Sequence, residues 1–99
     1  MKLEVAKRAK QQVARIELWW KANRPSAPRL FTEELESTLQ LICEMPGVGV
    51  SWPSTRSPGV RRALMPNTGH HVYFRVDEAR GIVRVMAVWG APCGNGPKL

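Results

Sequence analysis

Hydrophobic and polar residues alternate with two different periods along this chain, and each change of period marks a predicted element. Residues 2–7 alternate polar and apolar, which predicts a strand with Leu3 and Val5 facing a core. The period then becomes helical, and spacings of 4, 3 and 4 residues put one apolar set on a single helix face: Ala9, Val13, Ile16 and Trp20. Pro25 ends this helix, because a residue that precedes proline avoids helical geometry.

A second helix is predicted between Ser26 and Pro46. Ser26 is the expected N-cap, and Pro28 is tolerated in a first turn. Apolar positions continue at helical spacing through Phe31, Leu35, Thr38, Leu39 and Ile42. Few residues separate the two helices, so we expect them to form an antiparallel helical hairpin.

Residues 45–59 are predicted to form a loop, because three prolines and three glycines interrupt any regular pattern. A loop of this length in a small domain is often functional. It would serve equally well as a cover for one end of a sheet. The sequence leaves both roles open.

Three consecutive strands are predicted at residues 60–65, 70–76 and 82–89, with hairpin-length turns between them. The middle strand alternates between an apolar set and a polar set: Val72, Phe74 and Val76, and His71, Tyr73 and Arg75. The last strand is almost entirely apolar, which is typical of a central strand that is buried on both faces.

The predicted order is strand, helix, helix, strand, strand, strand, which indicates the α+β class. We expect an antiparallel sheet with the N-terminal helical hairpin on one face and an open opposite face. Residues 1–99 suit a single domain, and residues 90–99 are expected to form an irregular tail.

Composition narrows the functional classes. Hydrophobic residues make up 43% of the chain, too many for a disordered protein, and no apolar run is long enough to span a membrane. No secretory signal is visible, so we expect a cytoplasmic protein. The net charge of +7 suits a polyanionic partner such as RNA, DNA, a ribosome or an acidic protein segment, although a merely basic surface would give the same value. Cys43 and Cys93 lack zinc-site spacing and are expected to be unrelated thiols.

The predicted open face carries the residues best suited to chemistry. His71 can exchange protons near neutral pH, and arginines can hold a phosphate. Arg61 or Arg62 from the neighbouring strand would join this face, depending on the register. The alternative is that the same row of side chains is simply exposed and has no catalytic role.

Other sites are less well supported. His70 and His71 point to opposite faces of a strand and cannot share one metal, so neither a metal nor a cofactor is expected. No glycine-rich phosphate loop occurs. Trp19 and Trp20 could stack on bases, but their position beside the apolar helix stripe favours packing.

Four stretches in their order resemble the RelE/ParE family of bacterial toxins: residues 19–25, 58–62, 70–77 and 85–89. The similarity extends from about residue 2 to residue 97. The resemblance implies a toxin of a type II toxin–antitoxin system, with a helical hairpin on an antiparallel sheet. It also implies a partner antitoxin whose flexible, acidic and amphipathic segment wraps the toxin.

Members of this family differ in their targets. The resemblance implies either mRNA cleavage on the ribosome, as in RelE-like members, or inhibition of DNA gyrase, as in ParE-like members. Several RelE-like members carry a catalytic Arg where this chain has His71. Many relatives follow the last-strand Trp with a His and then arginines, whereas here Gly90, Ala91 and Pro92 follow Trp89. These departures favour the ParE-like branch.

Our leading hypothesis is a ParE-like growth inhibitor that binds gyrase and is neutralised by an antitoxin. Its expected target-binding residues are Arg61, Arg62, His71, Tyr73, Arg84 and Trp89. The alternative is a RelE-like, ribosome-dependent mRNA endonuclease, in which His71 would be the base. Its expected catalytic residues are His71, Arg62, Arg75 and Tyr73. A third hypothesis is a nucleic-acid-binding module with Tyr73 as a stacking platform.

Overall fold

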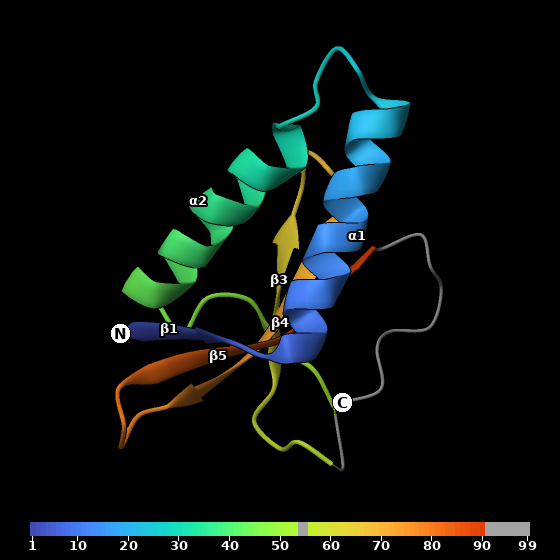
Figure 1. The fold of residues 1–99 in the computed structure, drawn as a ribbon. Coiled ribbons are helices and arrows are strands. Elements are labelled where there is room, and N and C mark those ends of the chain that lie inside the picture. Colours follow the sequence, from blue (N-terminus) through green and yellow to red (C-terminus); the bar gives the residue numbers. More distant parts are fainter. Residues whose placement is uncertain (54–55, 91–99) are drawn as a thin grey trace.

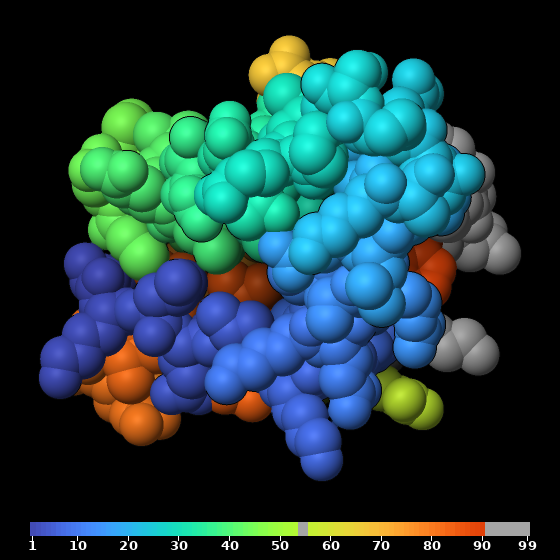
Figure 2. Space-filling view, turned by 45° about the horizontal axis from the view of Figure 1, so that its top comes forward, coloured from blue at the N-terminus to red at the C-terminus, as the bar shows by residue number. Residues whose placement is uncertain are grey.

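Two helices cover one face of a five-stranded sheet in the computed structural model, which describes residues 1–53 and 56–90. Figure 1 shows both helices on the same side of the sheet, and Figure 2 shows how their side chains cover it. The elements are β1 (Lys2–Val5), α1 (Lys7–Asn23), α2 (Leu30–Glu44), β2 (Val50–Ser51), β3 (Arg61–Met65), β4 (His70–Asp77) and β5 (Ile82–Gly90). The predicted tail lies outside the described residues after Gly90, as does Cys93, whereas Cys43 has a free thiol.

The sheet has the strand order β1-β5-β4-β3-β2. The α+β class and the N-terminal helical hairpin are therefore confirmed, and β5 lies inside the sheet, between β1 and β4. The pairs from β2 to β5 are antiparallel, but β1 runs parallel to β5, with Leu3 opposite Val83. As β1 is an edge strand, Val5 packs on the core while Leu3 stays 42% exposed. Among the described residues, neither helix has the length and apolarity that a membrane span requires.

The second helix starts later than the sequence predicted. It begins at Leu30 after an N-cap at Arg29 that has no capping side-chain hydrogen bond, so the expected cap at Ser26 is wrong. The backbone turns between the helices instead, with Ala27 N donating to Arg24 O at 3.0 Å. Pro28 explains the delay, because it keeps the preceding Ala27 out of helical geometry.

The main core lies between the helices and the sheet. Its fully buried members come from both layers: Ala9, Phe31, Ile42, Met65, Val72, Phe74 and Val83. A β-bulge in β5 shapes the second half of this core. Tyr73 pairs with Ala87 but Phe74 pairs with Val85, so Met86 is an extra residue in β5. The bulge lets both Val85 and Val88 face the helices and explains why the apolar run in β5 does not alternate.

Residues 45–59 also depart from the prediction in part, because two of them form the short strand β2. Val50 pairs with Arg62 and Ser51 pairs with Arg61, and Trp52 N donates to Val60 O at 2.8 Å just beyond the strand. The pairing is guided by tertiary contacts, since neither Val50 nor Ser51 belongs to an alternating run. This short strand brings Trp52 to the sheet.

Candidate functional site

The face of the sheet turned away from the helices, here called the far face, carries most of the predicted site residues. Residues opposite each other in a ladder point to the same face. Arg62 lies opposite Tyr73, whereas Arg61 lies opposite the core residue Phe74. The register therefore selects Arg62, and not Arg61, as the β3 arginine that shares a face with His71 and Tyr73.

Arg61 holds the preceding loop in place. Its guanidinium donates to three backbone carbonyls, at 2.8 Å to Gly47, 3.2 Å to Val48 and 2.8 Å to Gly49. Gly49 has a φ of +83° there, and a Cβ at this position would lie 2.3 Å from the carbonyl oxygen of Arg62. Only glycine fits this close approach without distortion. The predicted target-binding Arg61 is thus occupied with loop carbonyls.

The far face is not open at its centre, contrary to the expectation. Tyr73 is only 2% exposed and packs with Val60 and Ala87 in a second, smaller core. Trp52 from the loop lies edge-on to Tyr73, with 5.2 Å between ring centroids, and Trp89 packs against the same cluster. The loop therefore covers this part of the sheet, in line with one of the two roles that the sequence left open.

Arg62 and His71 lie at the border of this second core. The Arg62 guanidinium carbon lies 4.9 Å from the centroid of the Trp52 ring, a cation–π geometry. The His71 and Tyr73 ring centroids are 6.2 Å apart. We call Trp52, Arg62, His71, Tyr73 and Trp89 the aromatic cluster.

The surroundings of His71 keep its imidazole neutral. Partial burial lowers the pKa of His71 below 6.5, and the positive charge of Arg62 and the neighbouring His70 lower it further. At neutral pH the ring is consequently unprotonated, which is the form that can accept a proton.

The remaining predicted residues lie apart from the aromatic cluster. Arg75 is exposed and four positions beyond His71 on β4, a distance of about 13 Å along a strand. Arg84 lies opposite Arg75 and forms an ion pair with Glu4. The far face thus consists of two regions, the aromatic cluster and the arginine pair Arg75 and Arg84, which the sequence had suggested as one row.

His70 points to the helix side of the sheet, as predicted from the alternation. Its ring lies edge-on to Phe31 with 5.0 Å between centroids. Burial lowers the pKa of His70 below 6.5, and a backbone hydrogen bond to Thr68 and the charge of Glu34 oppose this only in part. Within residues 1–53 and 56–90, no three His, Cys, Asp or Glu side chains gather as metal ligands would.

Trp52 was not among the site residues predicted from the sequence. One signal could have indicated its role, because a large apolar ring in a loop rich in proline and glycine needs a surface on which to pack. Its partner on the sheet could not have been named, since that depends on the register of β2 against β3.

Comparison with known proteins gives a consistent picture. The family model described as the ParE toxin of the type II toxin-antitoxin system parDE matches residues 3–91. A structure of the chromosomal ParDE toxin–antitoxin system from P. aeruginosa has a TM-score of 0.73 at 16% identity, covering 91% of this chain and 95% of that chain. No curated protein matches the sequence.

Structures of RelE share the fold as well. The isolated E. coli RelE toxin has a TM-score of 0.61 at 17% identity, covering 91% of this chain and 83% of that chain. A chain of the intact E. coli RelBE toxin–antitoxin complex has a TM-score of 0.59 at 17% identity, covering 91% of this chain and 95% of that chain. At these identities, the solved structures establish the common fold alone.

Proposed function

Because the chain belongs to the ParE toxin family of type II toxin–antitoxin systems, we propose that it is a growth inhibitor that acts on DNA gyrase. A cognate antitoxin neutralises it. The family match supports this target, because the resemblance to ParE-like members implies inhibition of gyrase. Gyrase is a cytoplasmic enzyme in bacteria, so the proposal includes a cytoplasmic site of action.

The burial of Tyr73 is the observation that carries the proposal. A general acid or base must come within hydrogen-bond reach of the proton that it transfers. Tyr73 is 2% exposed beneath Trp52, and Arg75 lies about 13 Å along β4 from His71. The four residues expected of a nuclease are therefore not gathered around one point. A face with a rigid aromatic cluster and exposed arginines suits binding instead.

The antitoxin is the second partner in the proposal. The structural neighbours include the ParDE toxin–antitoxin system and the RelBE toxin–antitoxin complex. A chain with a net charge of +7 is well suited to associate with an acidic segment, because complementary charge speeds encounter.

Ribosome-dependent mRNA cleavage is the second candidate, and one observation favours it. His71 is held in the neutral form beside the positive charge of Arg62. A neutral imidazole could remove the proton from a ribose 2′-OH, while Arg62 stabilises the developing negative charge. This mechanism would use His71 and Arg62 without Tyr73.

A supercoiling assay with purified gyrase tests the proposed target. We expect inhibition that increases with the concentration of the chain. Arg75→Glu should weaken it at least about fivefold, because it inserts a negative charge into the arginine pair of the far face. Lys10→Glu on the exposed side of α1 is the matched control and should change it less than about twofold.

The opposite result is equally clear. If a large molar excess leaves supercoiling unchanged, the gyrase proposal is wrong. Cleavage of mRNA on translating ribosomes by the chain, but not by its His71→Ala variant, would support the rival. The RelE-like mechanism would then replace the gyrase proposal.

A further inference from the structure

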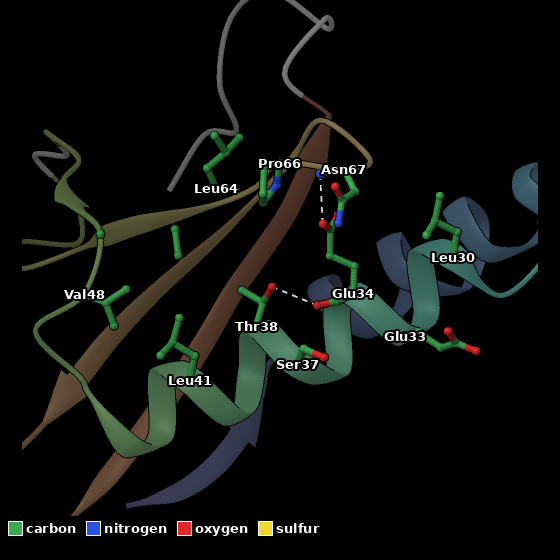
Figure 3. A pocket seen from close by; sticks show the side chains of 12 residues that line it. Leu30, Glu33, Glu34, Ser37, Thr38, Leu41, Val48, Leu64, Pro66 and Asn67 are labelled. Carbon is green, nitrogen blue, oxygen red and sulfur yellow. Dashed lines mark hydrogen bonds between the residues drawn. The ribbon is translucent and has the colours of Figure 1, made fainter.

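A groove of about 550 Å³ separates α2 from the outer part of β3. Figure 3 shows the side chains of Thr38, Leu41 and Val48 pointing into the space between the helix and the sheet. The groove lies on the edge of the sheet that ends in β2 and is distinct from the far face. Neither the gyrase proposal nor the nuclease alternative uses it.

The edge of β3 is unpaired beside this groove. β2 pairs only with Arg61 and Arg62, so it leaves the second half of β3 uncovered. The carbonyl of Val60 bonds to Trp52 on the β2 side, and backbone direction alternates along a strand. Accordingly, the N–H and C=O of Leu64 point outward from the sheet. Within the described parts of the chain, neither group has a hydrogen-bond partner.

The loop at residues 47–49 does not cover the edge of β3 at Leu64. The loop that follows α2 reaches β3 only at Gly49, where its backbone comes so close to Arg62 O that no Cβ would fit. Arg61 holds the carbonyls of Gly47, Val48 and Gly49 and so fixes the path of the loop toward the end of α2. An unpaired edge of this kind is a template for an added strand.

Exposed apolar side chains gather at the groove. Leu30 and Leu41 line it from α2 and are 38% and 43% exposed, whereas Leu64 lies opposite His71, so it borders the groove with its backbone and turns its side chain to the far face. Met45, which follows α2 directly, is 59% exposed. Such a concentration of large exposed apolar side chains indicates a protein-binding surface.

The charge of the groove indicates which kind of segment would bind there. Among residues 1–53 and 56–90, no Lys or Arg lines it, although the chain carries 15 of them, and its charged lining residues there are Glu33 and Glu34. The Glu34 carboxylate accepts hydrogen bonds from Asn67 N at 2.9 Å, Thr68 N at 3.0 Å and Thr68 Oγ1 at 2.7 Å (Figure 3 shows the first). In the described part of the chain, the one ion-pair partner of Glu33 is Arg29, at 3.6 Å, and both side chains are exposed. Glu33 is therefore available to a cation.

We propose that a segment of the antitoxin adds to the sheet as a strand paired with Leu64 of β3. Alternate apolar side chains of that segment fill the groove against Leu41 and Val48, and a lysine or arginine pairs with Glu33. This inference rests on the proposed antitoxin partnership. It gives this segment a basic character, unlike the acidic segment that the net charge of the whole chain would suggest.

Amide hydrogen exchange of the ¹⁵N-labelled chain, free and in the antitoxin complex, tests the docking site. Leu64 N–H should exchange rapidly in the free chain, while the amides of Ala63 and Met65, which face β4, exchange slowly. In the complex, the exchange of Leu64 should slow at least about tenfold.

A charge-reversal pair tests the chemistry of the segment. Glu33→Lys should weaken antitoxin binding at least about fivefold, because it places like charges together in the groove. Glu36→Lys makes the same change on an exposed part of α2 outside the groove, and it should change binding less than about twofold. The thermal unfolding midpoints of both variants verify that they fold.

The outcomes separate the two proposals. If no complex elutes from a sizing column, the partnership and the docking site both fail. A complex in which Leu64 still exchanges rapidly overturns the docking site alone. Tighter binding by Glu33→Lys would overturn it too, since the segment would then be acidic.

Discussion

At the scale of single residues, the protonation state of His71 is set by its neighbours. Burial and the charge of Arg62 both disfavour its protonated form. Its ring lies 6.2 Å from that of Tyr73, which is itself covered by Trp52. The protonation state of His71 therefore reports on the integrity of the aromatic cluster.

Replacing Arg62 tests this coupling. In Arg62→Gln the pKa of His71 should rise, because a positive charge that opposes protonation has been removed. Arg75→Gln removes the same charge about 13 Å away along β4, beyond the screening length of about 10 Å at 0.1 M salt. A titration followed by NMR of the imidazole distinguishes the two variants. Equal rises in both would show that Arg62 has no special effect.

Alanine substitutions at two glycines measure the cost of backbone strain and the cost of a steric clash separately. Gly49 and Gly59 have nearly equal φ values, +83° and +84°, but only Gly49 would place a Cβ against backbone atoms. Gly59→Ala should cost about 1–2 kcal/mol of unfolding free energy from the left-handed conformation. Gly49→Ala should cost about 1–3 kcal/mol more, because the chain must also move away from Arg62 O. Urea denaturation measures both, and equal losses would exclude the steric effect.

At the scale of elements, the loop before β3 is part of the sheet's packing. The Trp52 ring packs between Tyr73 and the guanidinium of Arg62. The loop that carries Trp52 has no periodic sequence pattern, yet it covers the second core. The positions of β2 and this loop are fixed by Arg61 and by the ladder to β3. The loop and the sheet should therefore respond together to substitution.

Trp52→Ala should uncover Tyr73 and lower the unfolding free energy by about 2 kcal/mol, since a packed aromatic ring is lost. Tyr73 is the only tyrosine of the chain, so its reactivity with N-acetylimidazole reports its exposure without ambiguity. Trp19→Ala is the control, because Trp19 is 51% exposed on α1 and should leave Tyr73 unreactive. An unreactive Tyr73 in Trp52→Ala would contradict the covering role of the loop.

The elements differ in how far the sequence predicts them. Both helices and the long strands follow from local periodicity, which needs no knowledge of the rest of the chain. The choice between Arg61 and Arg62, the burial of Tyr73 and the bulge at Met86 depend on register, and register depends on side chains distant in sequence. The strands that carry the candidate residues were consequently predicted, but the division of these residues into two regions was not.

At the scale of the whole molecule, the two histidines link stability to pH. Both have pKa values lowered below 6.5 in the folded chain, so the unfolded chain binds more protons as the pH falls. Their contribution to stability is complete above pH 6.5 and is lost on acidification through the folded pKa values.

This predicts that the unfolding free energy from urea denaturation decreases between pH 7.5 and pH 5.5. His70→Gln should reduce that decrease, because glutamine does not titrate. His71→Gln should reduce it less, since His70 is the more buried of the two. A wild-type stability that is constant or rises over this interval would contradict the linkage.

The parallel pairing of β1 with β5 has a consequence for folding during synthesis on the ribosome. A ribosome makes residues 2–5 early and residues 82–90 only much later, yet these segments lie side by side in the sheet. β5 is also the strand that joins β1 to β4, so the nascent chain cannot assemble its full sheet before β5 has emerged. The sheet is therefore completed only after almost all of residues 1–90 have been translated. An antitoxin that is already present meets the nascent chain before this sheet is complete.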